Sequence, residues 1–109
     1  MKRMIISGGS RGLGAALVDE YRRAGYEITE LSRSGRSGDS VQVDLAQPKA
    51  AQQILDDEFG RIAADPCEHV LLFNNAGDVM PVGQVADKAV DTVLGNVNVN
   101  FVGAIVLLR

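Results

Sequence analysis

The hydrophobic pattern of this chain alternates between short apolar segments and segments of helical spacing. Residues 3–7 predict a buried strand, and residues 27–32 predict a second strand of alternating character. Residues 41–43 and 69–73 predict two more strands. Between the first two strands, apolar positions recur at helical spacing up to Gly25, which closes the predicted helix. The face of this helix that we expect to be buried carries Leu13, Leu17, Tyr21 and Ala24.

Two further helices are predicted in the second half of the chain. Pro48 suits the start of a helix, and Asp65-Pro66 ends that element. Its apolar positions are Ala51, Ile54, Leu55, Phe59 and Ile62. Residues 86–108 also have helical spacing, and polar or small residues within them predict a bend. The apolar positions there are Val90, Val93, Leu94 and Val97, and the bend-forming ones are Asn96, Asn98, Asn100 and Gly103.

Strands that alternate with helices favour a parallel sheet, because parallel neighbours need a long return connection with a right-handed crossover. The order of elements therefore predicts an α/β fold, a doubly wound parallel sheet in a three-layer α/β/α arrangement. Residues 1–109 form one expected domain, since no linker or internal repeat divides them. The chain stops within a predicted helix, so we expect only the first half of such a sheet, from a longer parent protein.

Composition supports a folded domain and narrows its ligands. Hydrophobic residues make up 46% of the chain and charged residues 23%, which is too apolar for a disordered protein. The net charge of −3 argues against a nucleic-acid partner. Residues 1–38 nevertheless hold seven Lys or Arg against four Asp or Glu, so we expect a small anionic ligand there.

The sequence also bears on location and on metal binding. The longest uninterrupted apolar stretch near the C-terminus, residues 101–108, is far shorter than the roughly 18 residues of a membrane span, so no membrane contact is expected. Cys67 is the only cysteine, which leaves no cysteine pair for a disulfide or a metal site. His69, the only histidine, is interpreted as structural. We therefore expect a cytoplasmic protein without a metal.

The segment SGGSRGLG, residues 7–14, lies between the first predicted strand and the first helix. Free backbone N–H groups and the helix dipole favour a phosphate there, although glycines at such a turn can also simply relieve crowding. The Gly-Lys-Ser/Thr ending of an ATP-binding P-loop is missing. The spacing of Gly8, Gly12 and Gly14 resembles the T-G-x-x-x-G-x-G motif of the short-chain dehydrogenase/reductase family, with Ser7 in the place of Thr.

Two later segments resemble the same family. Asp44-Leu45 follows the third strand, as in members whose Asp bonds the adenine amino group while the next residue packs on the ring. An ordinary Asp in a turn is the alternative. The segment Asn74-Asn75-Ala76-Gly77, directly after the fourth strand, resembles the family's characteristic N-N-A-G motif. Its implied part is mainly structural, close to the ribose of the cofactor.

A third resemblance lies in the long C-terminal helix. Asn100-Phe101-Val102-Gly103 resembles the family's Asn-x-x-Gly segment, whose Asn belongs to a catalytic tetrad and helps to hold a helix bend and a proton-relaying water. Asn98 is a nearby rival for that role, and a structural Asn in a helix kink is the alternative. With the glycine loop and the two earlier segments in the family's order, the resemblance covers the whole chain and implies a Rossmann-like fold.

The resemblance implies a bound dinucleotide, and the residues after the second strand favour NADP(H). NAD-binding Rossmann folds place an Asp or Glu at the end of that strand, where it would repel a 2′-phosphate. Ser32 occupies this position, while Arg33 and Arg11 lie where members of the family use basic residues on the 2′-phosphate. Two such contacts favour the binding of NADP over that of NAD by roughly tenfold to a thousandfold. Two alternatives remain, namely that the arginines are solvated loop charges and that Glu30 is the ribose ligand.

The implied cofactor-binding residues are Gly8, Ser10, Arg11, Gly12, Leu13, Gly14, Ser32, Arg33, Asp44, Leu45, Asn75, Ala76 and Gly77, with Asn100 as the implied catalytic residue.

The family implies an NADP(H)-dependent oxidoreductase that transfers hydride between nicotinamide and a carbonyl or alcohol substrate. Its chemistry also uses a Ser and a Tyr-x-x-x-Lys pair. Neither tyrosine qualifies, because Gly25 stands four residues after Tyr21, and Glu30 four residues after Tyr26. We therefore expect an enzyme as the parent protein, with a non-catalytic NADP-binding sensor or scaffold as the alternative.

The family also implies a homodimer or homotetramer that associates through the helix 86–108. From this part of the chain, residues 78–83 are expected to border the substrate site.

Overall fold

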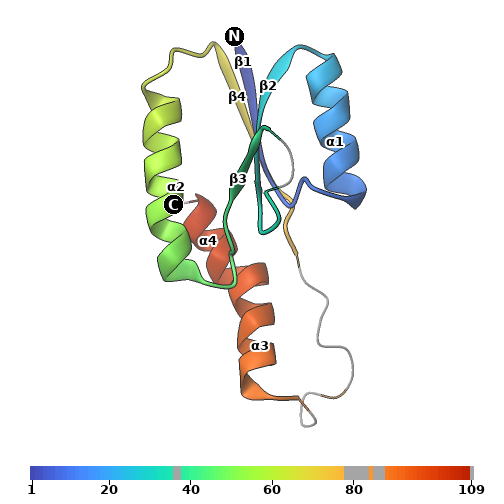
Figure 1. The fold of residues 1–109 in the computed structure, drawn as a ribbon, viewed down its shortest axis with the longest axis vertical. Coiled ribbons are helices and arrows are strands. Elements are labelled where there is room, and N and C mark those ends of the chain that lie inside the picture. Colours follow the sequence, from blue (N-terminus) through green and yellow to red (C-terminus); the bar gives the residue numbers. More distant parts are fainter. Residues whose placement is uncertain (36–37, 78–83, 85–87, 109) are drawn as a thin grey trace.

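The chain folds around a parallel sheet, as a computed structural model of residues 1–35, 38–77, 84 and 88–108 describes. The sheet has four strands in the order β3-β2-β1-β4 (Figure 1). Its strands are β1 (Lys2–Ser7), β2 (Tyr26–Ser32), β3 (Ser40–Gln42) and β4 (His69–Asn74). The predicted parallel α/β arrangement is confirmed, and each strand lies within one residue of its expected bounds.

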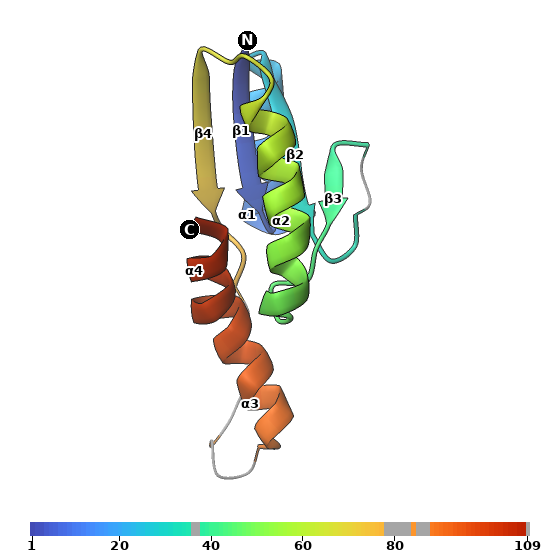
Figure 2. The ribbon, with the colours of Figure 1, turned by 90° about the vertical axis from the view of Figure 1, so that its left-hand side faces the viewer.

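Helices cover both faces of the sheet, so the domain has three layers (Figure 2). The helix α1 (Gly12–Arg23) packs on the face that carries Met4 and Ile6. The helix α2 (Pro48–Ala63) packs on the opposite face, which carries Ile5. Because side chains alternate along a strand, β1 supplies both cores. The core under α2 also contains Leu31, Val43, Leu45, Ala51, Leu55, Ile62 and Leu107.

The register of the strands brings their carboxyl ends to one edge. Ser7, the last residue of β1, is level with Leu31 of β2 and with Asn74 of β4. The Gly8 N–H donates to the Leu31 carbonyl at 2.9 Å and so extends this pairing past the end of β1. Open α/β sheets bind their ligands at this edge.

The buried face of α1 agrees with the prediction at Leu17 and Tyr21, which pack against the core that contains Val18, but differs at its two ends. Leu13 is 71% exposed and Ala24 is also exposed, whereas Gly14 and Val18 are buried. A Cβ on residue 14 would lie 2.1 Å from the Gly8 carbonyl oxygen, so the helix meets the preceding loop backbone against backbone. This close approach turns Gly14 and Val18, rather than Leu13, toward the sheet.

The C-terminal helical region begins later than predicted. It consists of α3 (Val90–Val97), a π-helical turn η2 (Asn98–Val102) and α4 (Gly103–Leu108). Residues 86 and 87 lie outside the described residues, and Lys88 and Ala89 are not helical. The expected irregularity is the π-helical turn, in which the Gly103 N–H donates to the Asn98 carbonyl five residues earlier.

Two contacts hold this region against the segment that follows β3. A Cβ on Gly103 would lie 2.6 Å from the Leu45 carbonyl oxygen and 2.8 Å from the Leu45 Cβ, so the helix backbone touches that segment directly. The Asn98 amide donates to the Ala46 carbonyl at 3.1 Å. The π-helical turn is therefore fixed beside the carboxyl edge of the sheet.

The helical run Val90–Leu108 is more apolar than the sequence analysis assumed. Within the described residues it is one helix, 19 residues long with a mean hydropathy of 1.5, that is long and apolar enough to cross a membrane by length and composition alone. The earlier expectation counted only residues 101–108, but the helix continues through its asparagines. Only 11% of it is buried. Its exposed large apolar side chains are Val90, Leu94, Val97, Phe101, Ile105 and Leu108.

Replacing Gly103 by alanine is expected to lower the free energy of unfolding by about 1–3 kcal/mol, because the added methyl group has no room against Leu45. Gly95→Ala is the matched control. Gly95 lies in α3 with no atom within 4 Å of its Cβ position, so alanine should raise stability by about 0.5–1 kcal/mol through helix propensity. Urea unfolding measures both changes, and equal stabilities of the two variants would contradict this packing.

Candidate functional site

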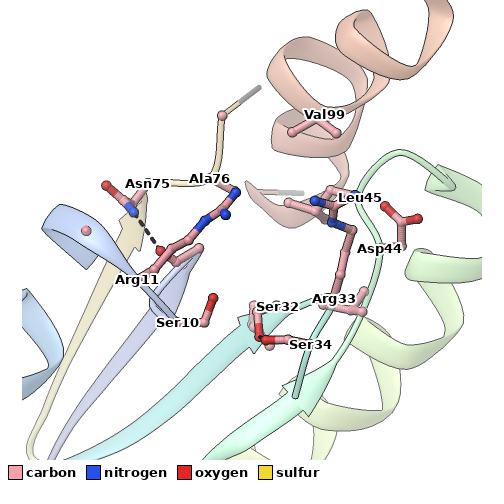
Figure 3. Close-up of a pocket in the computed structure, with 15 residues that line it drawn as sticks. Ser10, Arg11, Ser32, Arg33, Ser34, Asp44, Leu45, Asn75, Ala76 and Val99 are labelled. Carbon is pink, nitrogen blue, oxygen red and sulfur yellow. Dashed lines mark hydrogen bonds between the residues drawn. The ribbon is translucent and has the colours of Figure 1, made fainter. Parts of the chain in front are cut away.

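A pocket of about 720 Å³ lies at the carboxyl edge of the sheet (Figure 3). Pockets that bind small molecules and cofactors are about 300–1,000 Å³ in volume. Its walls come from the segments that follow each of the four strands and from η2. It is lined by Gly8, Ser10, Arg11, Gly12, Leu31, Ser32, Arg33, Ser34, Val43, Asp44, Leu45, Asn75, Ala76, Gly77 and Val99.

The glycine loop between β1 and α1 forms one wall. Gly8 has a φ of 71° and Gly12 a φ of 61°, in the left-handed region that glycine adopts at least cost. A Cβ on Gly8 would also lie 2.9 Å from the Cα of Ala76, so the loop lies directly against the segment after β4. The loop therefore needs glycine both for its turns and for its contacts.

Hydrogen bonds lock the loop to the segment after β4. The Ser7 hydroxyl, on a residue with 0% exposure, accepts the N–H groups of Asn75 at 3.1 Å and Ala76 at 3.0 Å. The Asn75 amide donates to the Gly8 carbonyl at 3.0 Å, drawn as a dashed line in Figure 3. This geometry agrees with the structural part that the N-N-A-G segment was expected to play.

The N-terminus of α1 presents unsatisfied donors to the pocket. Its N-cap residue, Arg11, makes no side-chain capping bond, and the first turn of the helix contains no acidic residue. The leading N–H groups of a helix lack intrahelical acceptors, and the helix dipole adds partial positive charge there. Together with the glycine loop, this helix end can receive an anionic group such as a phosphate.

Two arginines extend into the pocket from opposite sides (Figure 3). Both Arg11 and Arg33 are exposed, and neither forms an ion pair within the described part of the chain. Asp44 is the acidic residue among the lining residues. The charged side chains that line the pocket therefore carry a net positive charge.

Ser32 and Glu30, the two candidates for the end of β2, occupy different places. Ser32 lines the pocket. Glu30 is 2% exposed and lines a separate cleft of about 200 Å³, together with Gly9 and Arg22, on the side of α1. The position of Glu30 gives no support to the alternative in which it binds a ribose in the larger pocket.

Asp44 and Leu45 both line the pocket beyond β3. The Asp44 Oδ1 atom accepts the Ala46 N–H at 2.9 Å, which closes a local turn. Its second oxygen, Oδ2, makes no hydrogen bond with the described residues and is available to a ligand. Leu45 is 6% exposed and belongs to the core under α2, so its position is fixed by packing.

The two rival asparagines of η2 have different surroundings. The side-chain amide of Asn98 donates to the Ala46 carbonyl, as described above. Asn100 lies beside the pocket, because its Oδ1 atom is 3.4 Å from the position that a Cβ on Gly77 would take. This geometry places Asn100, rather than Asn98, next to a residue of the N-N-A-G segment.

Most of the predicted cofactor residues are brought together in this pocket, but two are not. Leu13 does not line the pocket and is largely exposed, and Gly14 lies behind the loop against Gly8. The expected border of the substrate site, residues 78–83, lies outside the described residues. Sequence reasoning missed four lining residues, namely Leu31, Ser34, Val43 and Val99.

A signal existed for three of the missed residues. Leu31, Ser34 and Val43 adjoin residues that were predicted to bind, at strand ends that must share one edge of a parallel sheet. Val99 directly precedes Asn100, the implied catalytic residue, but it is not at a strand end, and its place depends on how η2 packs across the end of the sheet.

The pocket can bind an anionic ligand but holds little acid–base chemistry. Its titratable lining side chains are Arg11, Arg33 and Asp44. Within the described ranges, no group of three or more His, Cys, Asp or Glu residues could hold a metal ion.

Comparison with known proteins gives the pocket a context. No family model matches the chain. The benzil reductase ((S)-benzoin forming) of Bacillus subtilis is 29% identical over 112 residues, which cover 98% of this chain and 46% of that protein. A short-chain dehydrogenase/reductase structure from Burkholderia vietnamiensis matches with a TM-score of 0.81 and 29% identity, over 97% of this chain and 57% of that one. Over almost its whole length the chain is similar to short-chain dehydrogenase/reductase proteins.

A second member of the short-chain dehydrogenase/reductase family matches equally well in structure. It is an oxidoreductase from Brucella ovis in complex with a partially ordered NAD, with a TM-score of 0.81 and 26% identity over 99% of this chain and 55% of that one. This chain spans about half the length of the first curated relative and of these two structures.

Proposed function

We propose that this chain is the NADP(H)-binding part of an oxidoreductase that transfers hydride between nicotinamide and a carbonyl or alcohol substrate. One observation carries the choice of cofactor: Arg11 and Arg33 extend into one pocket, and Ser32 stands where a carboxylate would repel a 2′-phosphate. The NAD in the Brucella ovis structure supports a nicotinamide dinucleotide in this kind of pocket. The two arginines of this chain add the preference for the phosphate.

The lining residues suggest how the cofactor lies. The glycine loop and the N-terminus of α1 receive the pyrophosphate, since they combine free N–H groups with partial positive charge. The free Oδ2 of Asp44 accepts the adenine amino group, and Leu45 packs on the ring. Ala76 and Gly77 leave room for the ribose that carries the nicotinamide.

Reduction of a carbonyl also needs a proton, and the tyrosines of this chain do not supply it at the pocket. Tyr21 packs against Tyr26, with ring centroids 5.0 Å apart, and against Phe73 at 5.4 Å, on the face of the sheet under α1. We assign the proton donor of the complete protein to a Tyr-x-x-x-Lys pair outside this sequence. Asn100, beside Gly77, takes the place of the tetrad asparagine that holds the proton-relaying water.

The proposed activity is tested on the complete protein with NADPH and benzil, the substrate named for the Bacillus subtilis relative. Consumption of NADPH, followed by its near-ultraviolet absorbance, should depend on the ketone. Tight NADPH binding without oxidation, across benzil and a panel of aliphatic and aromatic ketones, would instead favour the non-catalytic sensor.

Arg33→Asp is expected to weaken NADPH binding by roughly tenfold or more while sparing or improving NADH binding, because it removes one cation from the 2′-phosphate and adds a repelling carboxylate. Fluorescence titrations with both cofactors measure the two dissociation constants. Arg61→Asp, in the exposed part of α2, is a control for the change of charge alone. Unchanged titrations of both cofactors with Arg33→Asp would remove Arg33 from the assignment.

We also propose that a second copy of the chain covers the apolar face of Val90–Leu108, giving a homodimer or homotetramer. No residue of α3 is buried within the described structure, and Leu94 is 50% exposed. Leu94→Lys should therefore shift the protein to monomers in light scattering, because a charge enters the buried interface. Asp91→Lys, at a polar position of the same helix, should leave the assembly intact. A wild-type monomer at micromolar concentration, or recovery in the membrane fraction, would contradict this proposal.

A further inference from the structure

We propose that Glu30 is a positioning residue that sets the preference for NADPH by fixing the turn that carries Arg33. This inference rests on the NADP(H) function proposed above. Glu30 lies in β2, is 2% exposed and does not line the cofactor pocket. Any influence that it has on the cofactor must therefore pass through the residues that it holds.

A chain of hydrogen bonds runs from Glu30 into the turn after β2. The Glu30 Oε2 atom accepts the hydroxyl of Ser32 at 3.0 Å and that of Ser40 at 2.7 Å. A serine hydroxyl has one proton, and Ser32 donates it to Glu30, so its lone pairs remain for acceptance. The Ser32 Oγ atom accepts the Gly35 N–H at 3.2 Å. These bonds close the turn 32–35, and Arg33 lies inside that turn.

The first two residues of the turn are also held by residues at the end of β3 and directly after it. The Gln42 amide donates to the Arg33 carbonyl at 2.9 Å, and the Val43 N–H donates to the Ser32 carbonyl at 2.9 Å. The backbone of Arg33 is thus anchored on both sides. Its side chain extends into the pocket, where Figure 3 shows it opposite Arg11.

The side chain of Glu30 also packs against the glycine loop. A Cβ on Gly9 would lie 2.7 Å from the Cγ atom of Glu30 and 3.0 Å from Cγ2 of Val18, so the stem of Glu30 packs directly under the loop. The loop carries Arg11, and the turn carries Arg33. One buried side chain therefore contacts both segments that present a cation to the pocket.

Stability does not explain a carboxylate at this position. The Glu30 Oε1 atom is buried without a hydrogen-bond partner among the described residues, and none of the ion pairs in that part of the chain includes Glu30. A buried, unpaired charge usually makes a fold less stable than an apolar residue of similar volume does. The acceptor function toward Ser32 and Ser40 accounts for the carboxylate instead.

The test compares three variants of the complete protein. Glu30→Met keeps the volume under Gly9 but removes the acceptor, whereas Glu30→Gln keeps an acceptor oxygen. Val18→Ala loosens the packing under Gly9 without touching the turn, and so controls for general loosening. For each protein, titrations give the dissociation constants of NADPH and NADH, and thermal unfolding gives the stability.

Glu30→Met should reduce the preference for NADPH roughly tenfold, through weaker NADPH binding, with NADH binding and stability unchanged or improved. Glu30→Gln should keep most of the preference, and Val18→Ala should weaken both cofactors alike. A wild-type preference that survives in Glu30→Met, or an equal loss in Val18→Ala, would overturn this inference alone. A wild-type protein that binds both cofactors equally would overturn the proposed cofactor and this inference with it.

Discussion

A single buried hydroxyl, that of Ser7, joins the two strands around which the site is built. It accepts two backbone N–H groups from the segment after β4, and these donors would otherwise be buried and unsatisfied. With that segment in place, the Asn75 amide donates to the Gly8 carbonyl. The same carbonyl oxygen leaves no room for a side chain at position 14, so that residue must be a glycine. The orientation of α1, and with it the direction in which its N-terminus points, follows from this sequence of contacts.

The chemistry of the pocket follows from the same geometry. Apolar side chains fill both faces of the sheet, so polar groups collect at the edge where the parallel strands end. The donors there include backbone N–H groups, serine hydroxyls and two guanidiniums, while Asp44 already uses one oxygen on its own turn. Such an edge can orient an anionic ligand but offers few groups that could transfer a proton. The two tyrosines of this chain pack against each other under α1 and do not line the pocket.

The sequence predicted the features that depend on local pattern. The strands were found because their apolar runs end in glycine, serine, asparagine or aspartate, and the shared edge then placed most of the lining residues. Leu13 was misplaced because helical spacing alone cannot tell which of two adjacent faces a helix turns inward, and the close approach of Gly14 to Gly8 decided it. The contacts of Val99 and the hydrogen bonds of Glu30 join segments far apart in sequence, so no local pattern reports them.

The described domain leaves many large apolar side chains exposed. On the edge strand β4, Val70 is 48% and Leu72 is 40% exposed, and α4 packs beside that strand with Ile105 exposed as well. Apolar side chains gathered on a sheet edge and an adjoining helix are characteristic of surfaces that other protein covers. The proposed second copy would explain the hydropathy of Val90–Leu108, because a helix at a protein interface and a helix in a bilayer both exchange water for apolar contact. The side-chain amide of Asn98 donates to the Ala46 carbonyl and so ties this helix to the domain itself.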